Sequence, residues 1–249
     1  MDLKEVKGLD IKRHPWELAR LGALRHILKD ALMDGVKVLD LGCGDGFVAR
    51  ELFEGLSVPV VAVDSNFTAA DLSTLSRQSR NITYQKSLEG AGRFDLALLL
   101  DVIEHVDDDI GFLKDLVEKR LSNGGRVLIT VPAFNAFFSS HDAFLGHRRR
   151  YNLGELTALA RKAGLTVKSS GYLFSSLLFP KALSTLVEKA FGASPEKASG
   201  IGNWRGGRAL TVFLKAALDI DNAFSLALNR ALRIRLPGLT GWVLCEKQR

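Results

Sequence analysis

Apolar residues recur along this chain in two alternating patterns, one typical of buried strands and the other of helices. Short, almost continuous apolar runs predict strands at 36–41, 59–64, 82–86, 94–100, 125–131, 165–173 and 241–247. Apolar residues at three- and four-residue steps predict helices at 15–32, 46–55, 68–78, 108–120, 152–163, 174–191 and 208–233. Strands of this kind alternating with helices favour a parallel α/β sheet that is covered on both faces.

Two connections lack such periodicity. Residues 132–151 form a long connection, and long loops in compact domains are usually functional. Residues 192–207 are rich in Gly, Ser, Pro and Lys, which predicts a mobile loop.

The first strand ends in three glycines at alternate positions, Gly42, Gly44 and Gly46. A buried strand, a tight turn that needs glycine dihedrals and a following helix explain this pattern. A ligand can approach bare backbone at such a turn, and the exposed N–H groups favour a polar or anionic part of that ligand.

Asp64 ends the second strand, twenty residues after Gly44 (64 − 44 = 20). In a βαβ unit this offset places a carboxylate beside a cofactor ribose. The glycine spacing differs from the dinucleotide pattern Gly-x-Gly-x-x-Gly, and Asp40 and Asp45 crowd the place of a diphosphate. Acidic groups there suit a positively charged cofactor, which favours S-adenosylmethionine over NAD.

Four segments together resemble the class I S-adenosylmethionine-dependent methyltransferases. They are Val38–Gly46, Val61–Asp64, Phe94–Val106 and Gly125–Pro132. The resemblance implies a Rossmann-like, doubly wound, seven-stranded sheet whose last strand, near 240–247, is antiparallel. We therefore expect a cofactor-binding domain at 1–173 plus 237–249, and a helical insertion at 174–236 that serves the substrate.

The resemblance also implies which residues hold S-adenosylmethionine and its product S-adenosylhomocysteine. It assigns backbone contacts to the glycine turn, the ribose to Asp64, the methionine end to the residues after the fourth strand, and the adenine to the residues after the third. The expected set is Asp40, Gly42, Cys43, Gly44, Asp64, Ser65, Ser87, Leu88, Asp101 and Val102.

The segment Gly146–Tyr151 is similar to a Gly-His-x-Arg-Arg-Tyr loop of a methyltransferase subgroup whose members often accompany polysaccharide and lipid-linked glycan genes. His141 or His147 is a candidate general base for a hydroxyl acceptor. Candidate acceptor-binding residues are Arg148, Arg149 and Tyr151, and Arg150 is a further cation for a phosphate or carboxylate. Alternatively, Tyr151 and one arginine pin the loop to the domain.

The acidic stretch from Asp101 to Asp109 opens a helix, where the helix dipole favours negative charge. We therefore expect no metal site there. The N-terminal segment Arg13–Arg20 either closes over the cofactor, with Trp16 as an apolar anchor, or is a plain packing helix.

The insertion at 174–236 is unusually apolar for a surface segment and ends in a cluster of arginines. It can form a hydrophobic acceptor pocket, rest on a membrane surface, or cover the sheet and form a dimer interface. The sequence leaves these alternatives open.

Composition limits the remaining choices. The 47% share of hydrophobic residues is that of a globular protein. Two cysteines are too few for a disulfide framework, which favours a reducing compartment such as the cytoplasm. A cytoplasmic location allows peripheral contact with the inner membrane face. The N-terminus has no apolar core of a secretory signal, and no apolar window reaches about 18 residues.

We expect O-methylation of a small-molecule, lipid-linked or glycan acceptor. The net charge of +6 makes an RNA methyltransferase the alternative, but no added RNA-binding module and no Asn/Asp-Pro-Pro-aromatic motif is present, so nucleic acid is not the expected partner. A non-catalytic cofactor-binding protein is the third interpretation.

Overall fold

The computed structural model describes residues 12–32, 35–192 and 204–248. Its strands are β1 (Val38–Leu41), β2 (Val60–Val63), β3 (Ile82–Gln85), β4 (Phe94–Leu100), β5 (Leu121–Pro132), β6 (Leu165–Leu173) and β7 (Thr240–Lys247). Its α-helices are α1 (Pro15–Leu28), α2 (Phe47–Phe53), α3 (Ala69–Gln78), α4 (Asp109–Arg120), α5 (Ser140–Leu145), α6 (Leu153–Lys162), α7 (Leu178–Phe191) and α8 (Arg208–Leu232). Short 3-10 turns lie at Ile103–His105, Asn135–Phe137 and Ser175–Leu177.

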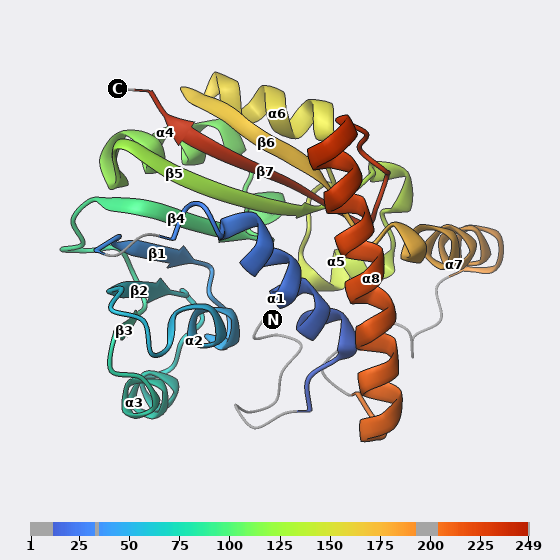
Figure 1. Ribbon diagram of the computed structural model, residues 1–249, viewed down its shortest axis with the longest axis horizontal. Coiled ribbons are helices and arrows are strands. Elements are labelled where there is room, and N and C mark those ends of the chain that lie inside the picture. Colours follow the sequence, from blue (N-terminus) through green and yellow to red (C-terminus); the bar gives the residue numbers. More distant parts are fainter. Residues whose placement is uncertain (1–11, 33–34, 193–203, 249) are drawn as a thin grey trace.

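The seven strands form one sheet in the order β3-β2-β1-β4-β5-β7-β6 (Figure 1). β7 is antiparallel to both of its neighbours, and the other pairings are parallel. The strand order reverses between β1 and β4, where ligands of open α/β sheets commonly bind. The predicted Rossmann-like fold with an antiparallel last strand and helices inserted before it is confirmed.

Alternation along the strands divides the core into two layers. In β1, Val38 belongs to one buried cluster and Leu39 to the other, because successive strand side chains point to opposite faces. Helices α1, α2, α3 and α8 contribute to the first cluster, and α4 and α6 contribute to the second. The sheet is therefore covered on both faces, as the nearly continuous apolar strands predict.

The structure differs from the predicted elements mainly between 132 and 151. This connection contains the one-and-a-half-turn helix α5, whose N-terminus has a reciprocal capping box between Ser139 and Asp142. Gly146 ends it with a φ of 83°. Six residues are too few to give a helical period in the sequence, so capping rather than periodicity defines this helix. Of the predicted loop at 192–207, residues 193–203 lie outside the described part.

The inserted helices are not detached from the rest of the molecule. Helix α8 packs against α1, and its Leu218 and Leu226 share the first buried cluster with the sheet. Phe174, at the start of the insertion, is fully buried and packs on Trp16 with ring centroids 5.6 Å apart. The division into two domains at these boundaries stays a prediction. Among the described helices, none combines the length and the hydropathy needed to cross a bilayer.

Candidate functional site

The glycine turn after β1 brings bare backbone close to the end of β4. Gly42, Gly44 and Gly46 have φ values of 76°, 56° and 71°, in the left-handed region that side chains rarely adopt. A Cβ on Gly42 would lie 2.6 Å from Cγ2 of Val102. The turn thus needs glycine both for its dihedral angle and for this close approach.

Asp64 is fixed between the glycine turn and the loop after β2. Its two carboxylate oxygens accept hydrogen bonds from the backbone N–H groups of Gly44 and Asn66, each at 2.9 Å. An exposed fraction of 9% leaves part of the carboxylate open to the neighbouring cavity. Because each oxygen has two lone pairs, Asp64 can accept further hydrogen bonds from a ligand.

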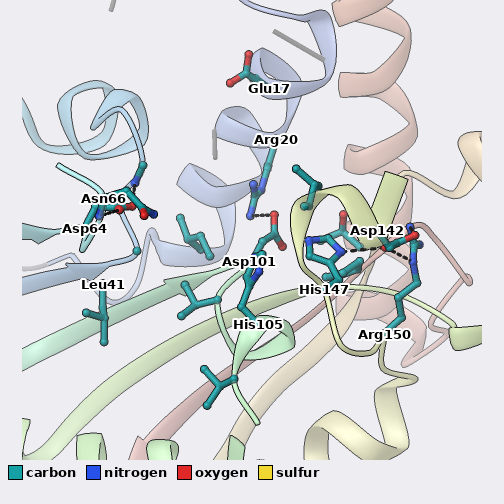
Figure 2. Close-up of a pocket in the computed structure, with 18 of the residues that line it drawn as sticks. Glu17, Arg20, Leu41, Asp64, Asn66, Asp101, His105, Asp142, His147 and Arg150 are labelled. Atoms are coloured by element: carbon teal, nitrogen blue, oxygen red, sulfur yellow. Dashed lines mark hydrogen bonds and ion pairs between the residues drawn. The ribbon is translucent and has the colours of Figure 1, made fainter. Parts of the chain in front are cut away.

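One cavity of about 850 Å³ runs along the carboxyl ends of the parallel strands. The last residues of β1, β2, β4 and β5 all line it, namely Leu41, Val63, Leu100 and Pro132. Figure 2 shows Asp64 and Asn66 toward one end and His147, Asp142 and Arg150 toward the other, with Arg20 and Asp101 between them. The cavity therefore joins the glycine-turn region to the loop after β5.

Helix α1 supplies a wall of this cavity. Trp16, Glu17 and Arg20 line it, and Arg20 forms an ion pair of 2.8 Å with Asp101 (Figure 2). Arg20 also donates to Oγ1 of Thr130 at 2.7 Å. Asp101 has a φ of 58°, so the backbone at the end of β4 is strained at the point where its carboxylate faces the cavity.

His147, Asp142 and Arg150 form a buried polar network at the other end. Nδ1 of His147 lies 2.9 Å from Asp142, and Arg150 donates from Nε and Nη2 to both carboxylate oxygens at 2.8 and 3.0 Å. Burial opposes ionisation of Asp142, but the hydrogen bonds from His147 and Arg150 outweigh it and hold the pKa of Asp142 well below its usual value. Because this carboxylate is ionised, it accepts a hydrogen bond from Nδ1 of His147, so Nε2 is the acceptor whenever the imidazole is neutral.

Two further basic groups line the same end. Burial lowers the pKa of His141, which favours its neutral form. Burial also lowers the pKa of Lys181, whose ammonium group donates to Oγ of Ser139 at 2.9 Å. Lys181 belongs to α7, so the inserted helix contributes directly to the cavity.

The structure brings most of the expected site residues to this cavity. Those that line it are Gly42, Gly44, Asp64, Ser65, Ser87, Leu88, Asp101, Val102, His141 and His147. Asp40 of β1 and Cys43 of the glycine turn are buried, with exposed fractions of 1% and 5%, and neither lines the cavity. Asp45 is also withdrawn, since Arg13 pairs with its carboxylate at 2.6 Å. The expected role of Asp45 next to a cationic cofactor therefore has no support from its position.

The candidate acceptor-binding residues lie outside the cavity lining. Arg148 pairs with Asp107 at 2.7 Å, Arg149 pairs with Asp109 at 3.3 Å, and the Tyr151 hydroxyl donates to Asp109 at 2.7 Å. These contacts attach the loop to the start of α4 through Tyr151 and two arginines, whereas the alternative interpretation of the motif expects one arginine in this role. Arg150 is the arginine of this motif that does line the cavity.

Glu104, His105 and His147 place ligand-type atoms within 4.8 Å of one another. Burial and the nearby Asp101 raise the pKa of Glu104 well above its usual value, which favours the protonated carboxyl. A protonated carboxyl is a poor metal ligand, because metal binding requires the carboxylate. The expectation of no metal stays a prediction.

Sequence reasoning did not single out Arg20 and Lys181, which both line the cavity. Arg20 belongs to the segment Arg13–Arg20, where Trp16 drew attention as an apolar anchor. Lys181 follows Pro180 in an apolar stretch, and only the fold shows that its side chain faces the cavity.

Comparison with known proteins places the fold and site in a family context. A family model described as a methyltransferase domain matches residues 17–170, more than half of the chain. The mitochondrial ubiquinone biosynthesis O-methyltransferase of Arabidopsis thaliana is 34% identical over 119 residues, or 43% of this chain and 37% of that protein. The ubiquinone biosynthesis O-methyltransferase of Ruegeria sp. (strain TM1040) is 27% identical over 181 residues, or 64% of this chain and 72% of that protein. The match covers 37% of the length of the Arabidopsis relative and 60% of the length of the ubiquinone biosynthesis O-methyltransferase of Rickettsia typhi, so the chain spans only part of these relatives.

Solved structures share the fold at low sequence identity. A protein described as a putative sarcosine dimethylglycine methyltransferase from Galdieria sulphuraria superposes with a TM-score of 0.56 and 18% identity, covering 94% of this chain and 86% of that one. The 1,6-didemethyltoxoflavin-N1-methyltransferase of Burkholderia thailandensis, solved with bound 1,6-didemethyltoxoflavin and S-adenosylhomocysteine, superposes with a TM-score of 0.55 and 17% identity, covering 93% of this chain and 79% of that one. These similarities concern the fold alone.

Proposed function

Because this chain belongs to the methyltransferase-domain family, we propose that it transfers the methyl group of S-adenosylmethionine to a hydroxyl oxygen of a small-molecule acceptor. The observation that carries the proposal is the single cavity that joins Asp64 at one end to the His147–Asp142 pair at the other. Such a cavity can hold a nucleoside cofactor and an acceptor together, which is the alignment that methyl transfer requires.

The cavity residues fit S-adenosylmethionine. The Asp64 carboxylate has lone pairs for the two ribose hydroxyls, and the turn at Gly42 and Gly44 has no side chains to obstruct the ligand. Near the middle of the cavity, Arg20 and Asp101 offer a cation and an anion for the carboxylate and ammonium of the methionine end. The bound cofactor supplies an electrophilic methyl group on a sulfonium sulfur.

His147 is the general base in this proposal. The ionised Asp142 holds the proton on Nδ1, which leaves Nε2 to accept the proton of an acceptor hydroxyl. As that oxygen forms its bond to the methyl carbon, the carbon–sulfur bond breaks and its electron pair stays on sulfur. Arg150 neutralises part of the charge on Asp142 and is committed to it by two hydrogen bonds, so it positions the pair.

The acceptor is the finer part of the proposal. Lys181 and His141 give the acceptor end of the cavity a basic, polar lining, which suits an acidic hydroxyl or an anionic substituent. The Gly-His-x-Arg-Arg-Tyr motif and the names of the relatives support a quinone-type, lipid-linked or glycan acceptor. The cytoplasmic location expected from the cysteine content stays part of this proposal.

The test is transfer of a labelled methyl group from S-adenosylmethionine to a panel of catechols and to a lipid extract. We expect His147→Ala to lower turnover by about 10²- to 10⁴-fold, the usual contribution of a general base, and His141→Ala to lower it less. The exposed His26 on α1 provides a matched His26→Ala control, which keeps full turnover. Full turnover in His147→Ala would contradict the assignment of His147 as the base, and full turnover in both His147→Ala and His141→Ala would contradict any histidine base.

A further inference from the structure

Helix α7 has its apolar face turned to solvent. Its most exposed large apolar side chains are Phe179, Leu183, Leu186, Val187 and Phe191, with exposed fractions of 77%, 54%, 64%, 40% and 86%. Their spacing of 4, 3, 1 and 4 residues places all five on one side of the helix. An amphipathic helix on a globular protein ordinarily buries such a stripe, and exposed apolar patches commonly mark sites that bind a membrane or another protein.

Polar contacts fix α7 in this orientation. Two of them reach the N-terminus of α5: Lys181 donates to Oγ of Ser139 at 2.9 Å, and Glu188 accepts from the N–H of Ser140 at 2.7 Å. Lys189 donates to the carbonyl of Ala136 at 3.1 Å. These three side chains lie on the side of α7 that faces the protein, and rotation of the helix to bury its apolar stripe would break all of the contacts.

Helix α8 repeats the arrangement. Its protein-facing side carries Asn222, which accepts from the N–H of Phe174 at 2.9 Å, and Asn229, which donates to the carbonyl of Ser170 at 2.7 Å. Its exposed side carries large apolar side chains with exposed fractions of 58–70%, at Val212, Phe213, Ile220 and Phe224. Two helices of one insertion thus expose apolar side chains, and both helices lie toward the right in Figure 1.

The two helices and Arg233, which ends α8, carry six basic and three acidic residues, so their net charge is positive. The carboxylates of the two helices are engaged, Glu188 with Ser140, Asp219 with Lys215 and Asp221 with Ser176. Exposed arginines lie at both ends of α8, at Arg208, Arg230 and Arg233. Apolar side chains flanked by cations are the composition of helices that lie in the headgroup region of anionic lipid.

We propose that α7 and α8 dock this protein on an anionic lipid surface, with their exposed apolar side chains in the headgroup region. A second copy of the chain on these faces would bring the arginines at the ends of α8 close to identical arginines, whereas anionic headgroups complement their charge. Leu177, just before α7, and Lys181 of α7 line the cavity, so α7 has one side on the cavity and its apolar side exposed. An acceptor anchored in the lipid would then meet the cavity next to α7. Docking itself does not depend on methyl transfer, so it can fail or hold independently of the proposed function.

The test is flotation of the full chain with vesicles of phosphatidylcholine alone or with 30% phosphatidylglycerol. We expect flotation with the anionic vesicles and much weaker flotation with phosphatidylcholine, and we expect added salt to weaken the anionic binding. Phe179→Ser/Phe191→Ser on α7 and Phe213→Ser/Phe224→Ser on α8 should each lower partitioning tenfold or more. The matched control is Leu56→Ser/Phe144→Ser, which changes two exposed apolar residues outside these helices and should bind normally.

Circular dichroism and binding of S-adenosylhomocysteine identify any variant that fails to fold. Absence of vesicle binding by the wild-type protein, or equal losses in the control, would overturn the proposal. So would a dimer in light scattering that the α7 and α8 substitutions convert to a monomer while the wild type does not float. That result would assign the same faces to an interface between two copies.

Discussion

Asp40 and Asp64 carry the same functional group in opposite electrostatic settings. Asp64 accepts two backbone N–H hydrogen bonds and faces the cavity. Asp40 has an exposed fraction of 1%, and burial raises its pKa to about 7. In the protein without cofactor, Asp40 is therefore largely protonated below neutral pH, while a nearby ammonium group would favour its charged form.

Asp40 should make folding stability fall as pH rises from 4 to 7. In that range the unfolded chain has released the proton of this carboxyl while the folded protein still holds it. The free energy of unfolding then falls by up to about 1.4 kcal/mol per pH unit. Asp40→Asn lacks this titrating carboxyl group, so its free energy of unfolding relative to that of the wild type should rise from pH 4 to pH 7.

Urea unfolding at pH 4.5 and 7.5 measures this difference. The exposed Asp115 on α4 gives the control Asp115→Asn, whose difference from the wild type should stay nearly constant. A difference between wild type and Asp40→Asn that does not change with pH would show that Asp40 titrates as an ordinary carboxyl.

At the level of elements, the glycine turn depends on its contact with the end of β4. Gly42 and Gly35 have similar φ values of 76° and 80°, but only Gly42 has an atom within 4 Å of the position of a Cβ. Gly35→Ala should therefore cost about 1 kcal/mol of backbone strain. Gly42→Ala should cost a further 1–3 kcal/mol, in order of magnitude, because the new methyl group meets Val102.

Thermal or urea unfolding of the two variants checks this comparison, and Gly42→Ala/Val102→Ala should recover part of the added loss. Equal costs for Gly35→Ala and Gly42→Ala would mean that the turn can move away from β4.

Local patterns predicted the strands, the glycine turn and the position of Asp64 at the end of β2, because each depends on residues close together in sequence. They did not predict α5, which is shorter than two turns and is defined by its capping groups. They predicted helices in the insertion but not their orientation. Periodicity shows which residues share a face of α7, whereas Lys181 and Glu188 decide which face meets the protein.

For the molecule as a whole, the site is assembled from segments far apart in sequence. Arg20 meets Asp101 across 81 positions (101 − 20 = 81), and Lys181 reaches Ser139 from a different helix. The sequence identified the motif of residues 146–151 but not the direction of its side chains. Adjacent side chains diverge there, so Arg150 pairs with Asp142, while Arg148 and Arg149 pair with Asp107 and Asp109 at the start of α4.

The most direct test of the account is calorimetric titration of the folded protein with S-adenosylhomocysteine. We expect saturable one-to-one binding with a Kd on the order of 1 μM to 1 mM, the range of ordinary enzyme ligands. Asp64→Asn should bind roughly tenfold weaker or worse, because it loses charge-assisted hydrogen bonds to the ribose, and Asp115→Asn should bind like the wild type. The absence of saturable binding, or equal affinity in Asp64→Asn, would contradict a cofactor site at the glycine turn.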